Sequence, residues 1–199
     1  LMPTRWYRER KNEHYYKKAK RQGYRARSAY KLLQIQKKYD IMSPGDVVID
    51  LGAAPGGWSQ VAAERAKEVV AVDLDRMQPI DNVTFLQGDM TEDETLEQIR
   101  RHVDEADVVI SDMSPELTGN YTMDQARSVW LADNALQVAR ELLRPNGNFV
   151  CKVFMGEDYE EFRDEVRQAF NMVKPFTPEA SRKSSSEIYL VAKQFTGVQ

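Results

Sequence analysis

Residues 46–60 read DVVIDLGAAPGGWSQ, and this stretch decides the fold. The run Val47–Ile49 is short and β-branched, which is typical of a strand that is buried on both faces. Gly52, Gly56 and Gly57 follow it; glycine adopts backbone conformations that other residues avoid and lets a ligand approach closely. The stretch therefore predicts a buried strand, a glycine-rich turn and a helix start, an arrangement that binds ligands in open α/β sheets. A tight turn without a ligand is the alternative.

The composition is typical of a single globular domain. Of the 199 residues, 42% are hydrophobic and 30% are charged, and this length is sufficient for a substantial core. No apolar run approaches the roughly 20 residues of a membrane helix, so we expect no membrane partner. Residues 1–20 are polar and basic rather than signal-like. Cys151 is the sole cysteine and has no internal disulfide partner. We therefore expect a cytoplasmic protein.

The charge is distributed unevenly along the chain. The net charge is −3, yet residues 1–38 carry 13 Lys or Arg and 2 Glu, a balance of +11 that leaves −14 on the remainder. A basic segment on an acidic body indicates a polyanionic partner. Aromatic side chains lie among these charges and can stack on unpaired bases. They are Trp6, Tyr7, Tyr15 and Tyr16.

The chain divides into an arm and one domain. We interpret residues 1–26 as a basic N-terminal arm that contacts RNA; a solvated terminal arm is the alternative. Residues 27–199 show no repeat and alternate between helical and strand-like patterns, which predicts a single α/β domain. Helices are expected at 27–38, 58–66, 91–104, 123–143 and 157–170, and strands at 46–51, 68–73, 83–87, 107–111, 148–154, 172–176 and 187–193, with a turn at 144–147.

Three of the expected strands end in an acidic residue. Asp73 closes the second strand, 21 residues after Gly52, where a carboxylate often holds both hydroxyls of a nucleoside ribose. Asp89 follows the third strand and is placed to accept the exocyclic amine of an adenine. Asp112 follows the fourth strand and is predicted to face the same crevice as the glycine turn. For each acid the alternative is a helix cap.

Lys152 is the most informative lysine of the chain. It lies within the apolar run NFVCKVF, and burial of an ammonium group is costly unless the group is paired or neutral. Lys31 adjoins the apolar stripe of the helix expected at 27–38, and Glu187 opens the last strand. Taken singly, each of these two residues reads as an ordinary exposed charge.

Two other kinds of site are disfavoured. His14 and His102 lie in polar sequence without metal-ligand neighbours, so we expect no metal. The glycine spacing is Gly-x-x-x-Gly-Gly rather than Gly-x-Gly-x-x-Gly, which fits dinucleotide binding poorly.

Several motifs resemble those of one known family, over about Arg5 to Lys193. DLGAAPGGWSQ (50–60), SDMSP (111–115), CKVF (151–154) and SSEIYLVA (185–192), in this order after RSAYKL (27–32), closely resemble the FtsJ family of S-adenosylmethionine-dependent ribose 2′-O-methyltransferases. The resemblance implies a Rossmann-like methyltransferase fold, with a seven-stranded, mostly parallel sheet, helices on both faces and one antiparallel strand. It also implies S-adenosyl-L-methionine as the cofactor.

The resemblance further implies roles for individual residues. The implied catalytic residues are Lys31, Asp112, Lys152 and Glu187, and the implied cofactor-binding residues are Gly52, Gly56, Trp58, Asp73, Asp89 and Asp112. Lys152 is the candidate base, or it steers the hydroxyl or stabilises developing negative charge. Ser114 stands where alanine is commoner in the family.

The implied substrate is a uridine ribose in large-subunit ribosomal RNA, and we expect a monomer. Two alternatives are a 2′-O-methyltransferase that acts on transfer RNA and a catalytically silent RNA-binding protein in ribosome assembly.

Overall fold

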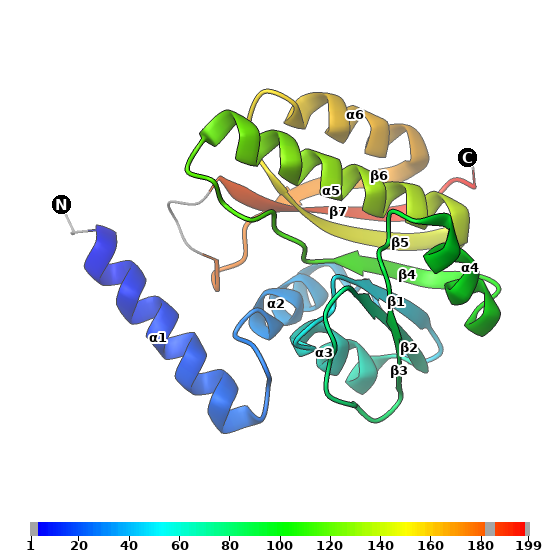
Figure 1. Cartoon of the computed structure of the whole chain (residues 1–199), viewed down its shortest axis with the longest axis horizontal. Coiled ribbons are helices and arrows are strands. Elements are labelled where there is room, and N and C mark those ends of the chain that lie inside the picture. The colour runs from blue at the N-terminus through cyan, green and yellow to red at the C-terminus, as the bar shows by residue number, and fades with distance from the viewer. Residues whose placement is uncertain (1–3, 182–185, 198–199) are drawn as a thin grey trace.

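The computed structural model describes residues 4–181 and 186–197, with side chains described from Tyr7 onward except that of Arg8. The side chain of Trp6, for which we predicted base stacking, and the motif residue Ser185 therefore lie outside the described part. Seven strands form one sheet in the order β3-β2-β1-β4-β5-β7-β6 (Figure 1). They are β1 (Val47–Leu51), β2 (Glu68–Asp73), β3 (Val83–Gln87), β4 (Ala106–Ser111), β5 (Leu143–Phe154), β6 (Phe170–Phe176) and β7 (Glu187–Phe195).

The sheet is parallel except at β7, which runs antiparallel to both of its neighbours. β1 is central, so that Val48 pairs with Val69 of β2 on one side and with Val108 of β4 on the other. The chain order reverses at β1 and β4, and the crevice at such a reversal is where open α/β sheets bind ligands.

Helices cover both faces of the sheet (Figure 1). On one face lie α4 (Asp93–His102), α5 (Tyr121–Leu142) and α6 (Tyr159–Ala169), and on the other lie α2 (Ala29–Tyr39) and α3 (Gly57–Arg65). Because strand side chains alternate, Ile49 packs into the α5 side and Val48 into the α2 side. The predicted fold class is confirmed. Among the described residues no helix is long and apolar enough to span a membrane.

The largest difference from the predicted strand limits is at the start of β5. The turn expected at 144–147 lies inside β5, which begins at Leu143 and shifts register against β4 between Ala106 and Val108. Asn146 there has a positive φ of 69°, which accommodates the irregularity. The guanidinium of Arg144 pairs with the carboxylate of Asp107, so that this polar segment stays attached to the sheet edge.

The N-terminal segment forms α1 (Thr4–Gln22), which lies beside the α/β body (Figure 1). Its only buried apolar side chains among those described, Tyr15 and Ala19, pack with Tyr30 of α2 and with Ala180. The rings of Tyr15 and Tyr30 lie 5.5 Å apart. Two apolar positions one turn apart give too narrow a stripe for the sequence to predict this helix.

We expect the substitution Tyr15→Ala to loosen α1 without unfolding the domain, because Tyr15 supplies the larger of the two buried contacts of the helix. Amide hydrogen exchange across α1 is expected to accelerate about tenfold or more, which corresponds to about 1.4 kcal/mol, while the strands keep their protection. Tyr16→Ala is the matched control, since this neighbouring ring is 59% exposed. Equal exchange in both variants would show that α1 is held by other contacts.

Candidate active site

The glycine turn packs directly against the end of β4. Gly52 follows β1 with a positive φ of 70°, and its N–H donates to the carbonyl of Val72 at 2.8 Å. A Cβ at this position would collide with the Cγ of Met113, the residue after Asp112. Only glycine allows the turn and the β4 end to approach so closely.

Arg25 fastens this turn to the loop that follows β2. Its guanidinium donates to the carbonyl of Pro55 at 3.2 Å, to that of Gln78 at 2.5 Å and to that of Pro79 at 2.7 Å. Gly56, with φ of 120°, lies against the same guanidinium. The turn is therefore held in shape before any ligand arrives, which reduces the entropy lost on binding.

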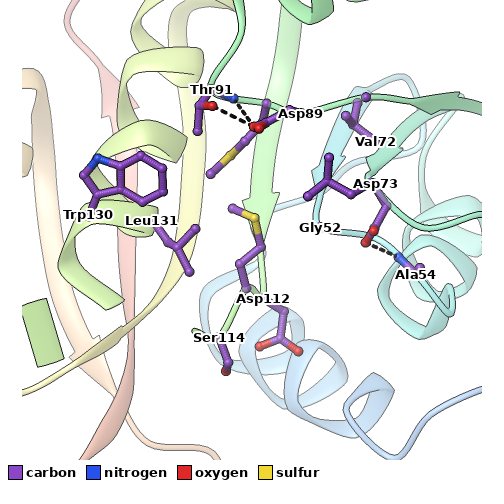
Figure 2. Close-up of a pocket in the computed structure, with 14 residues that line it drawn as sticks. Gly52, Ala54, Val72, Asp73, Asp89, Thr91, Asp112, Ser114, Trp130 and Leu131 are labelled. Carbon is purple, nitrogen blue, oxygen red and sulfur yellow. Dashed lines mark hydrogen bonds between the residues drawn. The ribbon is translucent and has the colours of Figure 1, made fainter. Parts of the chain in front are cut away.

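A cavity of about 390 Å³ opens beside the turn, a size within the usual range of ligand pockets. Figure 2 shows Trp130 and Leu131 of α5 on one side and Gly52 and Asp73 on the other. Of the expected cofactor-binding residues, four line this cavity: Gly52, Asp73, Asp89 and Asp112. Trp58 instead lines a smaller neighbouring cavity that Asp112 and Gly52 share. Gly56 lines neither of these two cavities.

Trp58 is buried, and its indole N–H donates to the carbonyl of Ser28 at 2.8 Å. Its ring packs against that of Tyr189 at a centroid distance of 5.5 Å. Trp58 thus joins α3 to the start of α2 and supports the floor of the site.

Asp73 and Asp89 make local hydrogen bonds and line the cavity as well (Figure 2). The two oxygens of Asp73 accept from the N–H groups of Ala54 at 2.9 Å and Asp75 at 2.8 Å. Asp89 Oδ1 accepts from the N–H of Thr91 at 2.9 Å and from its hydroxyl at 2.7 Å. Since a carboxylate offers about four lone-pair sites, both acids keep acceptor capacity for a ligand.

Two lysines and two acids meet next to this cavity. Lys152 Nζ lies 3.1 Å from Asp112 Oδ1 and 3.7 Å from Glu187 Oε2, and it is 2.9 Å from the hydroxyl of Ser114. Lys31 Nζ reaches the other oxygen of Glu187, Oε1, at 3.0 Å. Asp112 and Ser114 also line the cavity. The four residues that the sequence singled out as catalytic therefore form one cluster at its edge.

Burial and charge shape the acids of this cluster. Burial acts to raise the pKa of Glu187, but the nearby ammonium groups of Lys152 and Lys31 outweigh it and lower that pKa below its ordinary value. Tyr189 donates its hydroxyl to Asp112 at 2.5 Å. Burial, then the charges of Asp112 and Glu187, raise the pKa of Tyr189 well above its ordinary value, so this phenol stays a donor and holds Asp112 in place.

The sequence reasoning missed Tyr189 and the contact of Ser114 with Lys152. Tyr189 lies two residues after Glu187 on the same strand, and the period of two that places both on one face was the available signal. Ser114 was noted only as a departure from alanine, and no pattern indicated that its hydroxyl faces a lysine.

A third missed residue is Asp50, the only acid within the buried strand β1. Its Oδ2 accepts from the hydroxyl of Ser59 at 2.7 Å, and its Oδ1 is buried and has no hydrogen-bond partner among the described residues. Burial raises the pKa of Asp50 to about 8, helped by the charges of Asp112 and Asp73 and opposed by the Ser59 bond. The signal was a lone acid within an apolar strand.

Comparison with known proteins identifies the family to which the chain belongs. The family model of the FtsJ-like methyltransferases matches residues 24–195. The chain belongs to the FtsJ-like methyltransferase family. It is therefore a methyltransferase, and it uses S-adenosyl-L-methionine, as the motifs implied.

Relatives and solved structures agree with this membership. The chain is 50% identical to Ribosomal RNA large subunit methyltransferase E of Archaeoglobus fulgidus, over 93% of this chain and 97% of the relative. It is 55% identical to the protein of the same name from Halorubrum lacusprofundi, over 91% and 70%. A crystal structure named as a ribosomal RNA methyltransferase of Plasmodium falciparum superposes with a TM-score of 0.80 at 28% identity, covering 88% of this chain and all of that chain.

The cavity suits the cofactor of an FtsJ-like methyltransferase. The cofactor is a nucleoside with a charged amino-acid tail, and such a ligand needs carboxylates that accept hydrogen bonds from its hydroxyls and amines, together with apolar walls. Asp73 and Asp89 line the cavity with carboxylates. The apolar walls come from Val72, Leu131 and Trp130. No group of three or more His, Cys, Asp or Glu in the described part of the chain is arranged to hold a metal.

Asp50 predicts a pH-dependent stability. Between about pH 4 and pH 8 the folded protein holds a proton on Asp50 that the unfolded chain has released, so stability falls as pH rises through this window. In Asp50→Asn that fall is removed. The unfolding free energy of the variant relative to the unsubstituted protein is therefore expected to increase with pH, with a slope approaching about 1.4 kcal/mol per unit.

Urea unfolding at pH 5, 6.5 and 8 measures this difference. Asp81→Asn, at an exposed turn, is the control that should show no such trend. A pH-independent difference for Asp50→Asn would mean that Asp50 is ionised throughout.

Proposed function

We propose that this protein transfers a methyl group from S-adenosyl-L-methionine to a ribose 2′-hydroxyl in RNA, and that its target is a uridine of large-subunit ribosomal RNA. The proposal rests on the cluster of Lys31, Lys152, Asp112 and Glu187 at the edge of the glycine-turn cavity. Such a cluster can orient a sugar hydroxyl and manage its proton beside a methyl donor.

Two observations support ribosomal RNA as the substrate. The relatives at about 50% identity are named Ribosomal RNA large subunit methyltransferase E. The basic segment 1–38 carries a charge balance of +11, and α1 within it is fixed to the body next to α2, the helix that carries Lys31. A phosphate backbone that approaches Lys31 would therefore meet a positively charged surface, which complements its negative charge.

The cavity residues would hold the cofactor on the side of β1 to β3. Asp73 would accept hydrogen bonds from the ribose hydroxyls and Asp89 from the adenine amine, while Trp130 and Leu131 exclude water. When bound, S-adenosyl-L-methionine supplies an electrophilic methyl group on a sulfonium and leaves as a neutral thioether.

The cluster would act on the acceptor. The amine of Lys152 would accept the proton that the 2′-hydroxyl loses during transfer. Asp112, Ser114 and Glu187 hold that amine in a fixed position, and Glu187 connects it to Lys31. Lys31 places a second positive charge against the other oxygen of Glu187, so the two lysines share this carboxylate.

Incubation with radiolabelled cofactor tests the function. The RNA substrates are free large-subunit ribosomal RNA, assembled large subunits and transfer RNA, each prepared without the modification. We expect label in the ribosomal substrates at one uridine, with an alkali-resistant phosphodiester on its 3′ side. Label confined to transfer RNA, or RNA binding without label, would favour one of the two alternative functions. Label on a base would contradict ribose methylation.

Two substitutions at Lys152 separate a base from a fixed cation. Lys152→Ala is expected to lower kcat by about 10²–10⁴-fold, the usual contribution of a positioned base, with little effect on cofactor binding. Lys152→Arg retains the charge but cannot release its proton, so it should be equally inactive. Single-turnover methyl transfer measures both. Substantial activity in Lys152→Arg would show that the residue steers the hydroxyl as a cation.

Asp73→Ala should weaken cofactor binding. The variant loses a charged acceptor, which typically corresponds to about a 10- to 100-fold rise in Kd. Asp73→Asn keeps one acceptor for the N–H of Ala54, so it separates the loss of ligand contact from distortion of the turn. Calorimetric titration with S-adenosyl-L-homocysteine gives the Kd of each variant. An unchanged Kd in both would remove Asp73 from the site.

A further inference from the structure

A rigid corner of the chain lies next to the lysine–carboxylate cluster. It joins the end of β5 to α5 and to the start of β7. The N–H of Phe154 donates to the hydroxyl of Ser128 on α5 at 2.9 Å, and the N–H of Met155 donates to the carbonyl of Ser186 at 2.8 Å. The hydroxyl of Tyr121, the first residue of α5, donates to the carbonyl of Met155 at 3.0 Å.

Close packing fixes the same corner. Gly156 lies so near to Gln125 of α5 that a Cβ at this position would collide with the Gln125 side chain. Gln125 itself is buried. The segment Met155–Gly156 therefore lies flush against the first turns of α5, and it cannot move without breaking several contacts.

This corner nevertheless exposes large apolar side chains. Tyr121 is 62% exposed and Met155 is 47% exposed, and Leu117 and Met123 nearby in the sequence are exposed as well. Because the hydroxyl of Tyr121 is tied to Met155, the ring has a fixed direction and presents its surface to solvent. A fixed and exposed aromatic ring is suited to stacking on a flat, unsaturated partner.

The exposed corner lies close to the cluster along β5. Met155 directly follows β5, and Lys152 lies three residues earlier, roughly 10 Å along a strand that rises about 3.3 Å per residue. Phe154 pairs with Glu187 across the two strands. Figure 1 shows the first turn of α5 and the start of β7 at the same edge of the sheet, with α1 beyond them.

We propose that Tyr121, with Met155, is a stacking platform for an unpaired nucleobase of the RNA, at or next to the nucleotide whose ribose enters the cluster. This proposal deepens the proposed function and rests on it. The occupant is a base rather than an apolar protein surface because the platform borders the charged cluster and because α1 supplies cations to the phosphate backbone. A base in a regular duplex has no free face, so the substrate is expected to be single-stranded or unstacked at this point.

Equilibrium binding of a short RNA measures the platform directly. The probe is a short unpaired oligouridine, compared with the same oligouridine in a duplex with oligoadenosine. Tyr121→Ala is expected to raise the Kd for the unpaired RNA by roughly 5- to 150-fold, the range for stacking of a base on an aromatic ring. Tyr121→Phe keeps the ring and should retain most of the affinity. Gln137→Ala, on the exposed side of α5, is the control.

Two further variants make the result specific. Tyr121→Leu keeps apolar area without a ring, so it should bind as weakly as Tyr121→Ala if stacking is the interaction. Met155→Ala leaves the Tyr121 hydroxyl bond to the backbone carbonyl intact and should show a smaller loss. Cofactor Kd and the unfolding midpoint are measured for every variant, and both should match the unsubstituted protein.

The outcomes separate this inference from the function on which it rests. Wild-type affinity of Tyr121→Ala or of Tyr121→Leu for the unpaired RNA would overturn the platform. RNA binding does not require methyl transfer. An unsubstituted protein that binds RNA through Tyr121 but transfers no methyl group would therefore contradict the proposed function alone. Methyl transfer that is equally efficient in Tyr121→Ala, with an unchanged KM for RNA, would contradict the platform alone.

Discussion

The pairing of the Lys152 amine within the sheet is the interaction on which the site depends. An ammonium that is only 9% exposed needs charged or polar partners, since an unpaired buried charge is costly. β5 lies between β4 and β7, so Asp112 reaches Lys152 from one side and Glu187 from the other. The reversed direction of β7 is essential here. It brings the first residue of β7, rather than its last, to the carboxyl edge of β5.

Some parts of this site and its sheet could be predicted from the sequence, and others could not. β2 and β3 were predicted with their observed limits, because short β-branched runs end there in an acid or a glycine. Lys152 stood out because a charge within an apolar strand conflicts with its surroundings. Lys31 and Glu187 gave no such conflict. The family resemblance, rather than their local pattern, singled them out, and only the fold shows that one carboxylate contacts both lysines.

The features that escaped prediction depend on contacts between segments distant in the sequence. The helix α1 is polar almost throughout, and the two buried apolar side chains that the structure describes in it depend on contacts with Tyr30 and Ala180. The early start of β5 depends on Asp107, whose carboxylate holds Arg144 against the neighbouring strand. Local propensity does not report such pairings, so a turn at 144–147 was the natural but wrong expectation.

Asp112 connects the two halves of the site. It lines the cavity built by the loops after β1 to β3, and it also contacts Lys152 and Tyr189. In the proposed reaction a methyl donor and an acceptor hydroxyl would lie in line, and a side chain shared by both halves would couple their positions. The hydroxyl of Tyr189 donates to that carboxylate, and the ring of Tyr189 packs against Trp58. The glycine turn, α3 and the lysine–carboxylate cluster are therefore linked by direct contacts, because Trp58 lies in the first turn of α3, immediately after the glycine turn.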